Sequence, residues 1–211
     1  MQTTYISKVT FIGDSRSGKT SIINRYQDNK FSKDPQSTIG VDFTIKEINA
    51  DPPRQPNNIK MQIWDTAGQE RFESVIKLYF RNSYAIVIVF DLTNDDSFKH
   101  ITDWIHTVRH EYDPELYLVV GNKSDLTPII TKTQVHEVLS KVLPKFNYEY
   151  LETSAKNNTN ITELFKLVIE HINKSTETDP PILKNELSLK KVDLVSNLSS
   201  STTMRHPNCC N

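Results

Sequence analysis

Hydrophobic and polar positions along the chain switch repeatedly between the period of a strand and the period of a helix. Apolar residues that alternate with polar ones or form short continuous runs indicate strands, and apolar residues three or four positions apart indicate helices. Strands are predicted at residues 5–13, 41–49, 59–65, 84–90, 116–121 and 148–152, and helices at residues 18–27, 95–111, 132–142 and 160–173.

Strands that alternate with helices predict an α/β fold with a doubly wound, mostly parallel sheet of six strands and helices on both faces. The runs 84–90 and 116–121 are apolar throughout, as expected for central parallel strands. Residues 41–49 and 59–65 are expected to pair across a proline-rich connection, residues 51–58. In such a sheet ligands bind at the carboxyl ends of the strands. In the second helix, the residues spaced to face the core are Phe98, Ile101, Trp104, Ile105 and Val108.

The length and composition of the chain fit one domain followed by a tail. Of the 211 residues, 36% are hydrophobic and 24% are charged, enough for one filled core, and we expect the domain to span residues 1–173. Residues 174–211 are rich in Ser, Thr, Asn and Lys and contain no aromatic residue, which predicts a flexible tail. The alternative is a transient amphipathic helix between Ile182 and Leu198.

Charge and cysteine content argue against several classes of protein. The net charge of -1 and the pI near 6.6 leave no basic excess for binding nucleic acid. The N-terminus lacks the pattern of a secretory signal and the longest apolar run, residues 84–90, is too short to span a bilayer, so we expect a cytosolic chain. The only cysteines are Cys209 and Cys210, so the folded body has no cysteine for a disulfide or a metal site.

The segment from Gly13 to Thr20, GDSRSGKT, follows a predicted strand and opens a helix. This is the pattern of a phosphate loop, in which successive backbone N–H groups and a helix N-terminus bind phosphate groups. We expect Lys19 to neutralise the β- and γ-phosphates and the Thr20 hydroxyl to bind Mg²⁺. Contacts with the nucleotide are expected from Ser15, Arg16, Ser17, Gly18, Lys19, Thr20 and Ser21.

Two further polar motifs follow strands and indicate which base is bound. Asp125, in the segment Asn122-Lys-Ser-Asp125, can accept hydrogen bonds from N1–H and the 2-amino group of guanine, and adenine offers no hydrogens at these positions. The Asn122 side chain would hold this loop, and the Lys123 stem can lie over the base. The segment Thr153-Ser-Ala-Lys156 can offer a backbone N–H to guanine O6. Contacts with the base are expected from Asn122, Lys123, Asp125, Ser154, Ala155 and Lys156.

Two segments are placed to sense the γ-phosphate. Asp65 ends a strand and can hold a water bound to Mg²⁺, the Gly68 N–H can reach the γ-phosphate, and Gln69 can orient the attacking water. Thr38 can complete the Mg²⁺ shell and bond the same phosphate. These contacts exist only while the γ-phosphate does, so its loss should release both segments.

With these motifs, residues 5–173 resemble the small GTPases of the Ras superfamily and specifically the Rab family. The runs Ile39-Gly-Val-Asp-Phe43, Trp64-Asp-Thr-Ala-Gly-Gln-Glu-Arg-Phe72 and Leu78-Tyr-Phe-Arg81 are similar to Rab signatures. The resemblance implies a single P-loop GTPase domain. It implies that effectors read an aromatic triad and that another aromatic, Phe31, meets the guanine edge. The triad corresponds to Phe43, Trp64 and Tyr79. Similarity around residues 104–109 and 151–156 leans toward Rabs of the Golgi.

The C-terminus, Cys209-Cys210-Asn211, resembles the Rab ends that carry geranylgeranyl groups on both thiols. The alternatives are an unmodified tail and a disulfide between the adjacent cysteines. With five basic and four acidic residues, the segment 174–211 is not a polybasic patch, so two lipids would have to anchor it. The resemblance implies a switch in vesicle trafficking on the cytoplasmic face of a Golgi or endosomal membrane, cycling with the cytosol. Its implied regulators are an exchange factor, a GTPase-activating protein, a GDP-dissociation inhibitor and a prenylation escort protein.

Arg16 and Ser17 depart from the Rab pattern, which has a small residue and valine at these positions. Either the Arg16 side chain lies near the phosphates and alters hydrolysis or release, or it points to solvent and only its N–H matters. The departure also leaves open a pseudo-GTPase that holds nucleotide without cycling. An ATP-dependent kinase is disfavoured by Asp125 and by the lack of an acceptor-binding or lid segment.

Overall fold

The computed structural model describes residues 4–34, 36–49, 58–68 and 79–178. Its contacts divide the chain into a compact unit, Met1–Lys174, and a second unit, Ser175–Asn211, of which only the first four residues are described. The strands described are β1 (Thr4–Ile12), β2 (Val41–Ile48), β3 (Asn58–Thr66), β4 (Ala85–Asp91), β5 (Leu116–Asn122) and β6 (Tyr148–Glu152). The helices described are α1 (Lys19–Asp28), α3 (Asp95–Glu111), α4 (Lys132–Val142) and α5 (Ile161–Thr178).

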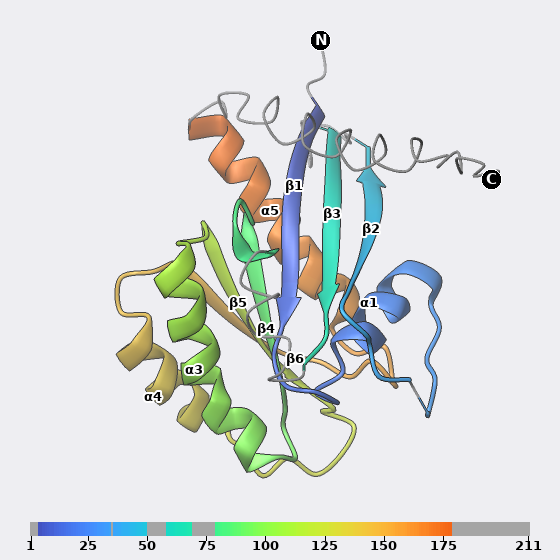
Figure 1. Ribbon diagram of the computed structural model, residues 1–211, viewed down its shortest axis with the longest axis vertical. Helices are drawn as coiled ribbons and strands as arrows, with labels where there is room; N and C mark the ends of the chain where they lie inside the picture. The colour runs from blue at the N-terminus through green and yellow to red at the C-terminus, as the bar shows by residue number, and fades with distance from the viewer. Residues whose placement is uncertain (1–3, 35, 50–57, 69–78, 179–211) are drawn as a thin grey trace, which may run out of the picture. The chain divides into compact units, whose positions relative to one another are not determined.

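The described strands form one sheet in the order β2-β3-β1-β4-β5-β6. The pairings of β1 with β3 and β4, and of β5 with β4 and β6, are parallel. Only β2 runs antiparallel to its neighbour, with Phe43 opposite Trp64 in the register (Figure 1). The predicted α/β fold with a mostly parallel sheet is therefore confirmed.

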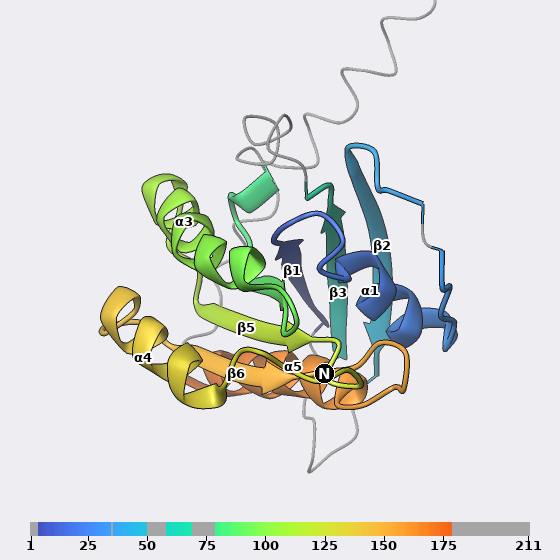
Figure 2. The ribbon, with the colours of Figure 1, turned by 90° about the horizontal axis from the view of Figure 1, so that it is seen from below.

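Helices pack on both faces of the sheet, and β4 shows how the sequence encodes this (Figures 1 and 2). Successive side chains of a strand point to opposite faces. Accordingly, Ala85, Val87 and Val89 join the core with α1 and α5, whereas Ile86, Ile88 and Phe90 join the core with α3 and α4. A strand that is apolar at every position is thus explained by its burial from both sides.

The helix predicted at 160–173 continues to Thr178. Residues 174–178 contain neither glycine nor proline, so nothing in this polar stretch breaks the helix, whereas Pro180 and Pro181 follow shortly after its end. The connection predicted at 51–58 lies outside the described residues except for Asn58, which begins β3. Among the described residues, no helix combines the length and the apolar character needed to cross a membrane.

Candidate nucleotide-binding site

The loop between β1 and α1 has the conformation of a phosphate cradle. Gly18 has φ +100°, and a Cβ there would lie 2.1 Å from Asn122 Nδ2, so only glycine fits this turn. Lys19 is buried, and its ammonium donates to the carbonyl oxygens of Gly13 (2.8 Å) and Asp14 (2.9 Å). Burial lowers the pKa of Lys19 to about 8, although Asp65 and Asp14 oppose this. The site thus holds a poorly solvated cation that an anion would stabilise.

A pocket of about 130 Å³ opens at the start of α1 and is lined by the predicted nucleotide contacts of the loop, with the exception of Ser17. It brings the loop together with Thr38 from the segment before β2 and Gly68 from the segment after β3. The residues that line it are Ser15, Arg16, Gly18, Lys19, Thr20, Ser21, Gln36, Ser37, Thr38, Thr66 and Gly68.

The three residues predicted to act at Mg²⁺ meet at one edge of this pocket. The Thr20 hydroxyl donates to Asp65 Oδ2 (2.6 Å), and the hydroxyls of Thr20 and Thr38 lie 2.7 Å apart. Because Thr20 gives its proton to Asp65, Thr38 is the donor in the second contact. Burial raises the pKa of Asp65, while the hydrogen bond from Thr20 and the charge of Lys19 oppose the rise. The other carboxylate oxygen, Oδ1, is buried and has no hydrogen-bond partner.

Gly68 lies against the phosphate loop. A Cβ on it would lie 2.4 Å from the Asp14 carbonyl carbon and the Ser15 nitrogen, and 2.5 Å from Lys19 Nζ, so no larger residue fits. One residue earlier, the Ala67 N–H donates to the Gly40 carbonyl oxygen (2.8 Å), which ties together the two segments predicted to sense the γ-phosphate. Gln69, predicted to orient the attacking water, lies outside the described residues.

Asn122 ties the base end of the site to the phosphate loop. Its Nδ2 donates to the Ser17 carbonyl oxygen (2.9 Å). Its Oδ1 accepts from the Thr153 hydroxyl (3.2 Å) and the Ala155 N–H (3.3 Å). One buried amide thus joins three segments that are far apart in the sequence.

The Asp125 carboxylate is held from the segment after β6. Oδ1 accepts from the Ser154 hydroxyl (2.6 Å), and Oδ2 lies 3.3 Å from Lys156 Nζ. Burial raises the pKa of Asp125, but the hydrogen bonds from Ser154 and Lys156 outweigh it, so the pKa lies below its usual range. The carboxylate therefore stays ionised, as acceptance of two hydrogen bonds from guanine requires. Lys123, at φ +67°, bonds to Asp91 Oδ2 at the end of β4.

Phe31, predicted to meet the guanine edge, lies close to Arg25, which in turn bonds to the segment after β6. The Arg25 guanidinium donates to the carbonyl oxygens of Ala155 (2.8 Å) and Lys156 (3.1 Å). Its central carbon lies 5.9 Å from the centroid of the Phe31 ring. The Phe31 side chain is 36% exposed.

The aromatic triad implied by the resemblance is contiguous. The Trp64 ring lies 4.8 Å from Phe43 and 5.3 Å from Tyr79 between centroids. Phe43 is 43% exposed, and nearby Ile39 is 88% exposed, so an apolar surface continues from the triad toward Thr38. Cys209 and Cys210 lie outside the described residues.

Arg16 and Ser17, the departures from the family pattern, differ in environment. Arg16 is exposed, with φ +64° and no hydrogen bond or ion pair to any described residue, which favours the interpretation that its side chain points to solvent. Ser17 is buried, and its hydroxyl has no hydrogen-bond partner.

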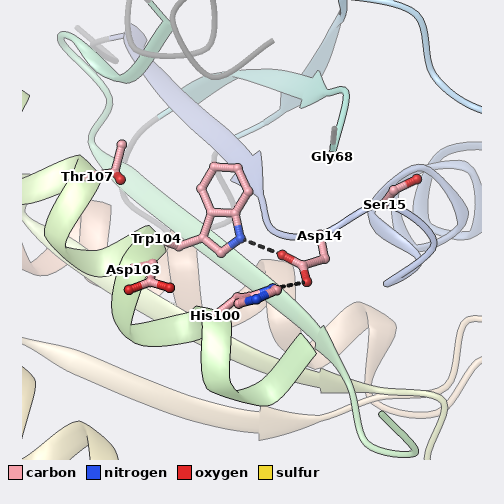
Figure 3. A pocket seen from close by; sticks show the side chains of 7 residues that line it. All are labelled: Asp14, Ser15, Gly68, His100, Asp103, Trp104 and Thr107. Carbon is pink, nitrogen blue, oxygen red and sulfur yellow. Dashed lines mark hydrogen bonds and ion pairs between the residues drawn. The ribbon is translucent and has the colours of Figure 1, made fainter. Parts of the chain in front are cut away.

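Three side chains whose contact the sequence did not predict meet beside the phosphate loop (Figure 3). The Asp14 carboxylate bonds to His100 and Trp104 of α3. Trp104 packs against the core as its spacing predicts, but it is only partly buried, and its indole N–H bonds to Asp14; the other four predicted core residues of α3 are buried. His100 and Trp104 lie one helical turn apart, and this spacing at the loop-facing side of α3 was the available signal.

The comparisons with known proteins agree with this geometry. The sequence model of the Ras family matches residues 8–174. The GTP-binding protein ypt1 of Schizosaccharomyces pombe is 35% identical over 207 residues, covering 98% of this chain and 97% of that protein. The Ras-related protein RabC of Dictyostelium discoideum is 35% identical over 192 residues, covering 90% and 94%. The Ras-related protein Rab-3C of Bos taurus is 35% identical over 184 residues, covering 84% and 78%.

These matches extend over nearly the whole region that resembles Rab proteins and confirm that resemblance. The chain belongs to the Ras family and is a small GTPase of the Rab type, an enzyme that hydrolyses GTP to GDP.

Proposed function

We propose that this GTPase is a membrane-anchored switch that binds GTP or GDP with Mg²⁺, hydrolyses GTP slowly and recruits effectors in vesicle trafficking. The observation that carries the proposal is the union, in one site, of Lys19, the Thr20–Asp65–Thr38 cluster and the ionised Asp125. Lys19 would bind the phosphates of a guanine nucleotide, the cluster would bind Mg²⁺, and Asp125 would bind the base.

The base end supports guanine rather than adenine. The Asp125 carboxylate is held by Ser154 and Lys156 and can accept from the N1–H and 2-amino groups of guanine. Lys123 is fixed at its tip by Asp91, so its stem can lie over the base plane. A backbone N–H of the segment 154–156 would donate to O6, with Phe31 at the base edge.

The donor set near Asp65 fits Mg²⁺. Mg²⁺ prefers oxygen ligands and usually takes one or two from the protein, with the rest from water and substrate phosphates. The Thr20 and Thr38 hydroxyls supply protein oxygens, and the buried, unpartnered Oδ1 of Asp65 can accept from a metal-bound water. When bound, the ion would neutralise charge on the β- and γ-phosphate oxygens.

The remaining residues would position the reaction. Lys19 would donate to β- and γ-phosphate oxygens in addition to its carbonyl partners, and the Gly68 N–H would donate to the γ-phosphate. Gln69 would orient the attacking water, and the phosphate-loop N–H groups of Ser15 to Ser21 would bind the remaining charge. Hydrolysis is expected to be slow alone, and an arginine from an activating protein would accelerate it.

The switch would work through Thr38 and Gly68. Their segments are joined by the Ala67–Gly40 hydrogen bond, so loss of the γ-phosphate would release both together. Effectors would read the surface around Phe43, Trp64 and Tyr79, next to the Thr38 segment.

Membrane attachment would come from lipids on Cys209 and Cys210 at the end of the tail 174–211, beyond the domain 1–173. The protein would work on the cytoplasmic face of a Golgi or endosomal membrane. It would cycle to the cytosol with a GDP-dissociation inhibitor, after delivery by a prenylation escort protein. An exchange factor and an activating protein would set its nucleotide state.

Displacement of a fluorescent GDP analogue from the purified full-length chain tests the proposal. GTP and GDP should displace it, and ATP should not at about a thousandfold excess. Gln69→Leu should lower single-turnover GTP hydrolysis while leaving GTP binding intact, and normal turnover by that variant would refute the role of Gln69. In cells, a tagged chain with both C-terminal cysteines changed to serine should lose its membrane localisation.

A further inference from the structure

Asp14, the second residue of the phosphate loop, is bonded at both carboxylate oxygens by side chains of one helix (Figure 3). Oδ2 lies 2.7 Å from Nδ1 of His100, and Oδ1 accepts from the indole N–H of Trp104 at 2.8 Å. His100 and Trp104 are neighbours on α3 at positions i and i+4, so they meet the carboxylate side by side. The carboxylate is therefore fixed in position and in orientation.

The backbone of the same residue faces the nucleotide pocket. The Asp14 carbonyl oxygen accepts from Lys19 Nζ (2.9 Å), the group expected on the β- and γ-phosphates. The peptide between Asp14 and Ser15 is also the surface against which Gly68 packs, with no room for a Cβ. A shift of Asp14 would thus move the surface that sets Lys19 and Gly68.

We propose that His100 and Trp104 are positioning residues for GTP hydrolysis, which act through Asp14 to hold the Asp14–Ser15 peptide in place against Gly68 and Lys19. The inference rests on the proposed function, because it concerns the γ-phosphate end of the same site. Neither residue touches the nucleotide in this proposal.

The surroundings of Asp14 indicate why the hydrogen bonds from His100 and Trp104 are important for the position of the loop. A pocket of about 370 Å³ lies beside this part of the loop, lined by Asp14, Ser15, Gly68, His100, Asp103, Trp104 and Thr107. Among the described residues that line this pocket, His100 and Trp104 are the two whose side chains bond to the Asp14 carboxylate, so these bonds support the loop from α3. The His100 side chain is 52% exposed, so its removal should leave the core intact.

The support that His100 gives to the Asp14 carboxylate depends on whether His100 is protonated. The charged groups that act on His100 within the described residues are Asp14 from the loop and Asp103 and Asp96 from its own helix, and all are acidic. The hydrogen bond with Asp14 raises the pKa of His100, partial burial opposes the rise, and these carboxylates add to it. Imidazolium always donates from Nδ1, whereas neutral imidazole donates there in only one tautomer. Support should weaken as the pH rises through the raised pKa.

The test compares single-turnover GTP hydrolysis and GDP dissociation for the GTP-loaded or GDP-loaded full-length chain. His100→Ala should lower hydrolysis about threefold to tenfold, the loss expected when a charge-assisted hydrogen bond no longer holds the site. GDP dissociation should change less than about twofold. His106→Ala, which removes an exposed histidine from the same helix, is the matched control and should behave as the wild type. Trp104→Phe, which removes the N–H donor and keeps a smaller aromatic ring in place, should lower hydrolysis similarly.

The pH profile separates positioning from a general structural role. His100→Asn keeps a donor near the position of Nδ1 but does not titrate, so it should restore most of the hydrolysis. The ratio of wild-type to His100→Asn rates should fall as the pH rises above the ordinary histidine pKa of about 6.5, because the pKa of His100 is raised. The ratio removes the effect of Lys19 titration on the rate, because Lys19 is present in both proteins and its pKa is lowered to about 8.

A double-mutant cycle tests whether His100 acts through Asp14. In an Asp14→Ala background, His100→Ala should have no further effect on hydrolysis. Three results would overturn the inference: His100→Ala hydrolysing at the wild-type rate, His100→Ala having the same effect with and without Asp14, or a GDP dissociation that rises as much as hydrolysis falls. If the wild type itself neither binds nor hydrolyses GTP, the proposed function fails instead.

Discussion

The base end and the phosphate end of the nucleotide site are held in different ways. At the base end, the functional groups already have protein partners: Asn122 joins three segments, and Asp125 is bonded at both oxygens. At the phosphate end, Lys19 bonds to backbone carbonyls, and one oxygen of Asp65 has no hydrogen-bond partner.

The difference suggests how recognition and switching are divided. A base end assembled by the protein is ready to discriminate before the nucleotide arrives, and little reorganisation is required on binding. A phosphate end with a buried cation and an unpartnered carboxylate oxygen is completed only by its ligands, so its state can report which nucleotide is bound. Nucleotide identity and nucleotide state would therefore be read at separate places.

The largest effect is expected from Asp125→Asn, which breaks the base end alone. Each hydrogen bond to a charged group contributes about 1.5–3 kcal/mol, so loss of the carboxylate should weaken GDP binding by about a hundredfold or more. The asparagine oxygen can still accept from Ser154, so the loop should keep its shape. Displacement of a fluorescent GDP analogue measures the change, with the exposed Asp113→Asn as control. Unchanged affinity would show that Asp125 does not contact the base.

Asp65→Asn should affect the other end and leave base preference unchanged. Residues that bond to metal-bound water typically contribute a factor of about 10–100 in metal affinity. The Mg²⁺ concentration for half-maximal hydrolysis should therefore rise by about that factor. Asp113→Asn is again the control, because Asp113 is exposed and lies outside the residues that line the phosphate pocket. An altered ratio of GTP to ATP affinity in Asp65→Asn would contradict the separation of the two ends.

Most of the fold could be predicted because the strands and helices follow simple periods. The runs that form most of β4 and β5 are mainly apolar, and every residue of these two strands is buried, as expected for burial on both faces. The phosphate loop and the base motif could also be located, because each depends on residues close together in the sequence at the end of one strand. The site roles assigned to these motifs, and those of Gln69 and the C-terminal cysteines, stay predictions.

Contacts between distant segments could not be predicted in the same way. Asp14 and His100 are 86 positions apart, and no local pattern links an acid in a loop to a histidine on a helix. Trp104 packs against the core as predicted, but its hydrogen bond to Asp14 could not be predicted, because spacing reveals the apolar side of a tryptophan and not the partner of its N–H. The contacts of Arg25 and Asp91 with the base loops could not be predicted either, because their partners also lie far away in the sequence.

Ser17→Val tests the point where the two ends meet. The Ser17 carbonyl oxygen accepts from Asn122 at the base end, while its hydroxyl is buried without a partner. An unsatisfied buried polar group costs about 1–3 kcal/mol, so valine should raise the free energy of unfolding of the GDP-bound protein by about 1 kcal/mol. Urea unfolding measures this, and Ser17→Ala separates loss of the hydroxyl from gain of apolar volume. A loss of stability in both variants would show that the hydroxyl bonds to the nucleotide.

The smallest effect is expected from Arg16→Gly, at the mouth of the phosphate end. Glycine relieves a left-handed conformation that costs a larger residue about 1 kcal/mol, but it loses about 0.5–1 kcal/mol of chain entropy on folding, so stability should hardly change. Because the Arg16 side chain is exposed and bonds to no described residue, single-turnover hydrolysis should stay within about twofold of the wild type. Arg16→Ala removes the charge but keeps the strain. If both variants change hydrolysis equally, the charge of Arg16 acts on the phosphates, and the phosphate end then includes a second cation besides Lys19.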